Sequence, residues 1–278
     1  TSNAFSSIGL KIKFCEIDKR TGSISLEYLK KTITKKTKAI CFVNFSGYVG
    51  NEILKIKKYC ELKKIYLIED AACALGNYYK KNSAGSFGDV GTFSLSATKT
   101  ITTGQGGVVI FKTKKHYKKC KEILDQGDNN WRKLNDHKKI GTNLRYNDIL
   151  ASFLLPQLQN LKNIINKSKE VYKILSKNLK NNFFYISEFN SPLYNIIFTN
   201  KREQFSDFLS KKNIKTIIQY KRINQNTCYK NITNENFSNS KFWEDCALFL
   251  PIGSGLNKKT AKRINQLLIQ KKDLLISL

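Results

Sequence analysis

The sequence predicts an α/β protein with a mainly parallel central sheet in a large first domain and a small α+β domain after it. Two observations predict this fold. Strand and helix patterns alternate through the first half of the 278 residues, and short strands separated by helices follow a long lysine-rich helical segment. A chain of this length can bury a sizeable core. We therefore predict a large domain over residues 1–164 and a small domain over residues 165–278.

Apolar runs and amphipathic segments define the elements of the first domain. We expect helices at 25–34, 51–63, 116–126 and 148–161. We expect strands at 11–16, 39–45, 65–68, 92–94 and 108–111. Because strands joined by helices tend to run parallel, a ligand is expected at the carboxyl ends of these strands.

The second domain has shorter elements. We expect helices at 164–179, 204–212 and 258–276, and strands at 183–186, 193–199 and 216–220. The polar stretch 224–240 predicts a loop. The segments 219–229 and 251–255 are candidate substrate-side loops.

The formal charge of +28 raises the question of a polyanionic partner. Most of the basic residues are lysines, and they are spread over nearly every predicted helix rather than gathered in one arm. This distribution favours a solvated surface over a nucleic-acid face, so a nucleic-acid-binding protein remains an alternative that rests on charge alone. A positive field also favours an anionic diphosphate as substrate.

The seven cysteines are scattered and form no C-x-x-C pair and no ligand-like group with the two histidines. This pattern predicts reduced thiols in a cytoplasmic protein without a metal site. No apolar run reaches the roughly 18 residues that a membrane-spanning helix needs, and the start of the chain has no secretory pattern. We therefore expect no membrane partner.

The stretch 68–110 is the most informative part of the chain. An apolar run ends in Glu69 and Asp70, and Lys99 follows between small hydroxylated residues and the glycine-rich turn 104–107. A lysine held away from water beside an acid is suited to be the amine nucleophile of a Schiff base. Taken alone, a lysine in so lysine-rich a chain is more often a surface residue.

This stretch resembles the DegT-type sugar-nucleotide aminotransferases. The family pattern reads roughly E-D-A-A-(Q/H)-A-x-G, then G-S-x-G-D-x-x-x-F-S-F-x-x-x-K, then T-T-G-E-G-G. This chain reads EDAACALG, GSFGDVGTFSLSATK and TTGQGG. The resemblance implies the fold type I of enzymes that use pyridoxal 5'-phosphate (PLP). It also implies transfer of an amino group, from glutamate, to a nucleotide-linked keto-deoxysugar for surface glycan or polysaccharide synthesis.

The resemblance also implies roles for single residues. Lys99 forms the Schiff base and moves protons, Asp70 pairs with the pyridine nitrogen, and Ser94 donates to the cofactor phosphate. From the residues alone, Asp70 is also suited to cap the segment from Ala71, and Ser94 to be a buried hydroxyl bonded to backbone. Glu69 is expected to be structural.

A second segment, residues 140–148 (IGTNLRYND), resembles the family's G-x-N-x-R-M-x-(D/E/N)-I. In the family this loop reaches the active site of the neighbouring subunit. The resemblance implies a cofactor or substrate contact for Asn143 in trans, and a homodimer with shared active sites. Arg145 is a candidate to bind a substrate anion, with a nearby carboxylate such as Asp148 as the alternative partner.

Several positions depart from the family pattern. Cys73 stands where the family has a Gln or His that bonds the cofactor's 3-oxygen, and a thiol is a weaker partner at that place. Ser96 and Asn44 replace histidines. These departures favour, as an alternative, a diverged PLP-fold protein that binds a sugar nucleotide or a partner without turnover. Lysine rather than histidine at 99 argues against the dehydratase branch of the family.

The first four residues, Thr1-Ser2-Asn3-Ala4, resemble the T-x-N-A that follows a proline-threonine-aromatic segment in the family. Ser-Asn-Ala is also a common cloning scar, which is the alternative. The resemblance implies an N-terminally truncated chain that lacks a G-T phosphate-binding turn and the aromatic that stacks on the cofactor. We therefore expect weak cofactor retention and little activity from these 278 residues alone.

Overall fold

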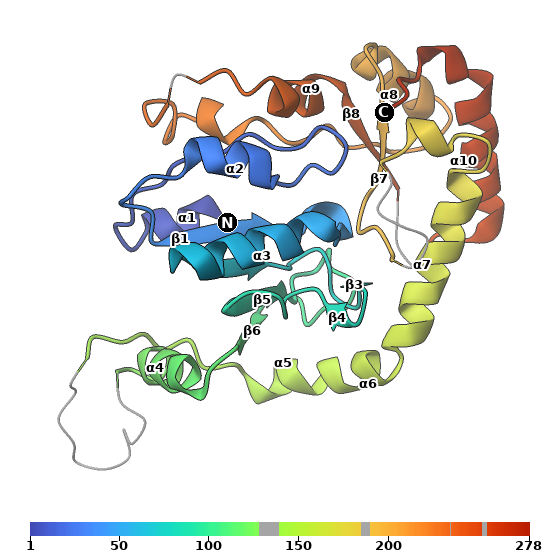
Figure 1. Ribbon diagram of the computed structural model, residues 1–278. Coiled ribbons are helices and arrows are strands. Elements are labelled where there is room, and N and C mark those ends of the chain that lie inside the picture. Colours follow the sequence, from blue (N-terminus) through green and yellow to red (C-terminus); the bar gives the residue numbers. More distant parts are fainter. Residues whose placement is uncertain (128–138, 185–189, 234, 252–254) are drawn as a thin grey trace.

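Four strands form the central sheet of the computed structural model, which describes residues 1–127, 139–184, 190–233, 235–251 and 255–278 (Figure 1). In spatial order the strands are β1 (Ala39–Val43), β2 (Tyr66–Asp70), β5 (Val90–Ser94) and β6 (Gly107–Phe111). The first three are parallel, and β6 is antiparallel to β5. The prediction of a mainly parallel sheet is therefore confirmed.

Helices and a buried cluster cover this sheet. The helix α3 has the predicted bounds, Asn51–Lys63, and buries Ile53, Ile56 and Cys60 with residues of β1 and β2. The helix α2 (Leu26–Thr32) begins where Ser25 accepts a hydrogen bond from the amide of Tyr28. Short elements complete this half: α1 (Ser2–Ser6), η1 (Phe45–Gly47), β3 (Tyr78–Tyr79) and β4 (Asn82–Ser83).

A row of helices leads from the sheet to the second half of the chain. These are α4 (Lys114–Leu124), α5 (Asp148–Ser152), α6 (Leu154–Gln159) and α7 (Leu161–Leu175). The single helix predicted at 148–161 is divided at Phe153, whose amide bonds to the carbonyl of Leu150 in a tighter turn. Figure 1 shows α5 and α6 running below the sheet toward the long helix α7.

The second half is built on an antiparallel pair of strands, β7 (Asn195–Phe198) and β8 (Ala247–Leu250), in which every residue is buried. The helices α7 and α10 (Lys258–Gln270) lie side by side and share one core (Figure 1). The remaining elements are η2 (Lys180–Asn182), α8 (Arg202–Ser210), η3 (Ile223–Gln225), α9 (Ser238–Cys246) and η4 (Lys272–Leu274). The division of the chain at residues 164 and 165 stays a prediction.

An aromatic cluster joins the two halves. Trp243 of α9 meets Phe45 of η1 edge to face, with ring centroids 5.3 Å apart, and meets Phe184 at the same distance. The indole nitrogen of Trp243 donates to the carbonyl of Lys19 at 2.9 Å. These contacts hold the second half against the carboxyl end of β1, which lies next to the candidate site.

Some predicted elements are wrong. Residues 11–16 form no strand, because no neighbouring strand gives them a backbone ladder, and the only pairing nearby is a single bridge between Ile17 and Ile24 among the described residues. The strand predicted at 216–220 is a single bridge from Ile217 to Phe249. The predicted loop 224–240 ends in the first turn of α9. A strand was also predicted at 183–186. There Phe183 forms a single bridge, and residues 185–186 lie outside the described residues.

Within the part of the chain that the structure describes, none of the helices has the length and apolar character to span a bilayer. The same residues contain no cluster of three or more His, Cys, Asp or Glu side chains suited to a metal ion.

Candidate active site

The parallel strands β1, β2 and β5 bring three polar segments to one edge of the sheet. Val43 is paired with Asp70, and Asp70 with Thr92, so the residues that follow each strand lie at the same edge. Asn44 follows β1 and its amide donates to the carbonyl of Asp70 at 3.0 Å. The segment that carries Lys99 follows β5. This is the edge at which parallel sheets place ligands.

The carboxylate of Asp70 ends β2 and is partly exposed. One oxygen accepts a hydrogen bond from the amide of Ala72 at 3.1 Å, and the other accepts one from the hydroxyl of Thr1. The alternative role of Asp70 was to cap a helix that begins at Ala71. No helix begins there, so Asp70 caps only a turn. The carboxylate of Asp70 therefore lies at the edge of the sheet, where Ala72 and Thr1 hydrogen-bond its two oxygens.

Glu69 points the other way, into the core. Its carboxyl group is fully buried and accepts hydrogen bonds from the amides of Gly85, Phe87 and Gly88. Burial raises the pKa of Glu69, and these three hydrogen bonds oppose that rise. The structural role predicted for Glu69 is confirmed, and the motif GSFGD is largely the loop that binds this acid.

Lys99 lies half-buried on the loop after β5, with its ammonium nitrogen 3.6 Å from the sulfur of Cys73. Burial raises the pKa of the Cys73 thiol, the charge of Lys99 lowers it, and the charge of Asp70 raises it. The backbone of Ser46 also lowers the pKa of this thiol. Cys73 contacts Lys99 and lies in the turn that directly follows Asp70, so these three residues form one cluster at the edge of the sheet.

Ser94 precedes Lys99 and the glycine-rich turn follows it, and the amide of Leu95, next to Ser94, donates to the carbonyl of Gly106 at 2.9 Å. The hydroxyl of Ser94 is 3.2 Å from that of Ser96 and accepts a hydrogen bond from the Ser96 amide at 3.3 Å. The alternative role of Ser94, a hydroxyl bonded to the backbone, is therefore present. In the turn, Gly106 has φ +117°, and an added Cβ would collide with the ring of Tyr146. The hydroxyls of Tyr146 and Thr103 are hydrogen-bonded, which ties the turn to the segment before α5.

Asn143 and Arg145 lie away from this cluster within the single chain. The guanidinium of Arg145 bonds the side-chain oxygen of Asn143 at 3.2 Å and lies 3.5 Å from a carboxylate oxygen of Asp125. A carboxylate partner was one of the two alternatives for Arg145, although the partner here is Asp125 rather than Asp148. The contacts of Lys99 are with Cys73, on another segment of the chain. Their predicted roles stay predictions.

Two tyrosines of the second half border the cluster and were not predicted individually. Burial raises the pKa of Tyr194, and the neighbouring Tyr220 and Cys73 raise it further. Ser46 fixes Tyr194, because its hydroxyl bonds both the amide and the carbonyl of Tyr194. Tyr220 lies in the segment 219–229 that was a candidate substrate-side loop. The other candidate, 251–255, lies mostly outside the described residues.

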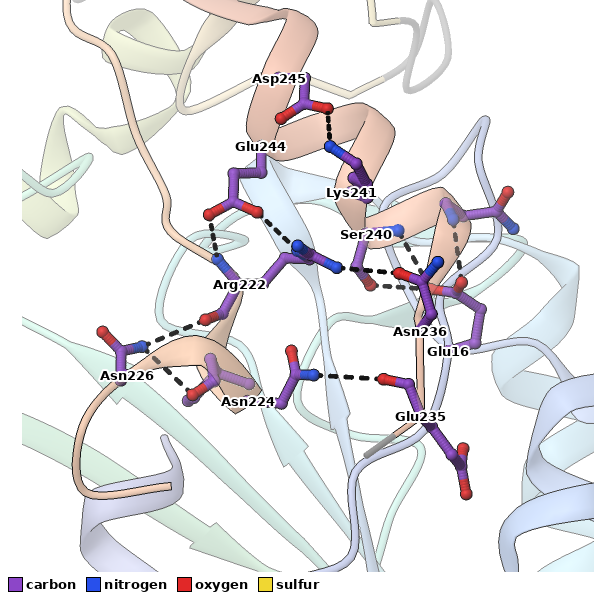
Figure 2. Close-up of polar contacts among 12 residues, drawn as sticks. Glu16, Arg222, Asn224, Asn226, Glu235, Asn236, Ser240, Lys241, Glu244 and Asp245 are labelled. Atoms are coloured by element: carbon purple, nitrogen blue, oxygen red, sulfur yellow. Dashed lines mark hydrogen bonds and ion pairs between the residues drawn. The ribbon is translucent and has the colours of Figure 1, made fainter. Parts of the chain in front are cut away.

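An ion pair anchors the segment that carries Tyr220. Figure 2 shows the guanidinium of Arg222 between the carboxylate of Glu244 on α9, at 2.5 Å, and the side chain of Asn236, at 3.2 Å. Glu16 in turn accepts hydrogen bonds from the hydroxyl and the amide of Ser240 (Figure 2). A carboxylate in this position also complements the positive end of the α9 dipole. The network fixes Tyr220 relative to the first half of the chain.

The residues at this edge fit pyridoxal phosphate at its two reactive ends. Asp70 offers a carboxylate for a protonated pyridine nitrogen, and Lys99 offers a primary amine for the aldehyde carbon. The side-chain oxygen of Asn44, next to Asp70, is buried and has no hydrogen-bond partner in the structure. A buried polar atom of this kind calls for a polar ligand or a water molecule.

Known proteins match this chain along most of its length. Residues 1–268 match the DegT/DnrJ/EryC1/StrS aminotransferase family. The chain is 34% identical over 181 residues to the GDP-perosamine synthase of Escherichia coli O157:H7, a match that covers 64% of this chain and 48% of that relative. It is 27% identical over 283 residues to the UDP-4-amino-4,6-dideoxy-N-acetyl-beta-L-altrosamine transaminase of Campylobacter jejuni, covering 96% of this chain and 75% of the relative. The chain spans about half the length of the GDP-perosamine synthases that it matches.

Solved structures agree with the sequence matches. Helicobacter pylori PseC, an aminotransferase involved in the biosynthesis of pseudoaminic acid, has a TM-score of 0.90 to this chain at 24% identity, covering 98% of this chain and 76% of that one. This likeness confirms the predicted fold of PLP-dependent transferases of fold type I. The fold and the match over residues 1–268 together establish that the chain belongs to the DegT/DnrJ/EryC1/StrS aminotransferase family.

Proposed function

We propose that this chain carries the catalytic lysine of a PLP-dependent aminotransferase that moves an amino group from glutamate to a nucleotide-linked keto-deoxysugar, in the synthesis of surface glycans. The observation that carries the proposal is the cluster of Lys99, Cys73 and Asp70 at the carboxyl edge of the sheet. The relatives named above, a GDP-perosamine synthase and a UDP-amino-sugar transaminase, support the substrate class. The net charge of +28 favours an anionic nucleotide diphosphate.

Each residue of the site has a task in this proposal. When bound, pyridoxal phosphate supplies an electron sink for the carbon that exchanges its amino group. The amine of Lys99 holds the cofactor and then carries the proton between the two carbons concerned. With the cofactor bound, the carboxylate of Asp70 would keep a positive charge on the pyridine nitrogen, Cys73 would be the partner of the ring oxygen, and Ser94 would donate to the phosphate. Asn143 contacts the cofactor of the neighbouring subunit.

The alternative is a protein that binds a sugar nucleotide without turnover, and Cys73 in place of Gln or His is the observation that favours it. The natural gene product that carries this sequence, mixed with pyridoxal phosphate and L-glutamate, is expected to release 2-oxoglutarate in an amount matching the cofactor. Addition of a nucleotide-linked keto sugar is then expected to make the release continuous. Binding of the sugar nucleotide with no 2-oxoglutarate would instead establish the alternative and overturn the aminotransferase.

We also propose a homodimer with shared active sites, in which Arg145 binds a substrate anion of the neighbouring subunit. The helices α5 and α6 support it, because they leave Ile149, Phe153 and Leu155 between 58% and 71% exposed. Several large apolar side chains exposed on one short segment favour a protein partner. Sedimentation is expected to give twice the mass of one chain, and Phe153→Lys is expected to give one chain. A wild type that sediments as a monomer contradicts the dimer, and Lys167→Ala on the exposed face of α7 is the control.

We further propose a cytoplasmic location. All seven cysteines are free thiols in the structure, as expected for a reducing compartment.

A further inference from the structure

The contact between Cys73 and Lys99 joins two nucleophiles. The sulfur and the amine nitrogen are 3.6 Å apart, so the thiol faces the amine. Cys73 forms no disulfide. A thiol in this position has a second reaction open to it, because an oxidised sulfur is an electrophile and the nearest nucleophile is the lysine amine.

We propose that oxidation joins Cys73 to Lys99 through a reversible sulfur–nitrogen bond. In the first step one hydrogen peroxide converts the thiol to a sulfenic acid and leaves as water. In the second step the amine of Lys99 attacks the sulfenic sulfur, the S–N bond forms, and the hydroxyl leaves with a proton from nitrogen as a second water. The sulfur loses two electrons, and the O–O bond of the peroxide accepts them.

The crosslink removes the amine that the proposed function needs, and in that respect alone the inference rests on the proposed function. A thiol reductant reverses it by attacking sulfur, which returns Lys99 as a free amine and Cys73 first as a mixed disulfide and then as a thiol. The reaction is expected to be faster at pH 9 than at pH 7. The reason is that burial raises the pKa of the thiol, so a larger share of it is the reactive thiolate at pH 9 than at pH 7.

The test uses mass spectrometry on the natural gene product without added cofactor. After treatment with hydrogen peroxide and proteolysis, we expect a pair of peptides joined at Cys73 and Lys99 and lighter by two hydrogen atoms than the sum of the two. Dithiothreitol is expected to separate them. Cys73→Ser and Lys99→Arg are each expected to abolish the joined pair.

Cys228 is the matched control, because it is an exposed free cysteine that reports whether the oxidant reached the protein. Oxidised Cys228 together with an unlinked Cys73, whether intact or converted to a sulfinic acid, overturns the inference. A pair joined through an added oxygen atom overturns the direct bond.

Preincubation with pyridoxal phosphate separates this inference from the proposed function. If Lys99 binds the cofactor, the amine is occupied and the yield of the joined pair is expected to fall at least fivefold. If the crosslink forms equally well with and without pyridoxal phosphate, the inference stands, and the proposed role of Lys99 in holding the cofactor is contradicted.

Discussion

Replacing Lys99 with alanine is expected to abolish the visible absorption band that lysine-bound pyridoxal phosphate gives, and with it the release of 2-oxoglutarate. The amine is the group that holds the cofactor, and no other lysine is hydrogen-bonded to Cys73 among the described residues. General acid–base catalysis alone contributes roughly 10²–10⁴-fold to a rate, so we expect activity to fall by more than about 10³-fold. The measurement is an absorption spectrum of the natural gene product with added cofactor, followed by the transfer assay.

Lys115→Ala is the matched control for Lys99→Ala. Lys115 lies on the exposed face of α4, and its loss is expected to leave both the band and the activity unchanged. A band that survives in Lys99→Ala, or that disappears equally in Lys115→Ala, contradicts the assignment of Lys99.

Local sequence patterns predicted the elements whose cause is local. The helix α3 has its predicted bounds, because its apolar positions recur at helical spacing and the left-handed conformation of Lys64 ends it. The strand predicted at 11–16 has an equally good local pattern, but a strand also needs a neighbour to complete its hydrogen bonds. The strand β8 was missed for a related reason: a continuous apolar run such as Ala247–Leu250 does not distinguish a buried strand from a buried helix.

The candidate site also contains residues that local sequence predicts and residues that only distant contacts bring in. Asp70 and Lys99 were named from one contiguous stretch of sequence, and the parallel pairing of β2 and β5 explains why their segments meet. Tyr194 is fixed beside the cluster by the hydroxyl of Ser46, nearly 150 positions earlier in the chain. Nothing local in the sequence indicates such a contact. Cys73 was singled out as a departure from the family pattern, but its contact with the Lys99 amine came only from the structure.

Glu69→Ala is expected to lower the free energy of unfolding by about 3–5 kcal/mol. Three buried backbone amides lose their acceptor, each at a cost of about 1–3 kcal/mol. The variant no longer buries a carboxyl group, and this gain offsets part of the loss. The net loss is a large share of the roughly 5–15 kcal/mol that stabilises a typical protein. Urea denaturation of the wild type and of Glu69→Ala measures this loss of stability. Glu27→Ala is the control, since that side chain is 71% exposed and its ion pair with Lys31 is screened by solvent and stabilises the fold little. A Glu69→Ala loss no larger than the control's contradicts the structural role.

The pH dependence of Glu69→Gln tests the same group by its charge. Burial raises the pKa of Glu69 above its ordinary value of 4.5, so the folded state keeps a proton that the unfolded state has already released. Stability from this group is therefore greatest below that ordinary value and falls as pH rises through the higher, folded pKa, after which it is constant. Glutamine does not titrate, so the stability of the wild type relative to Glu69→Gln is expected to fall with rising pH over this window. A relative stability that rises instead would mean that the three amides outweigh burial and that the folded protein prefers the ionised carboxylate.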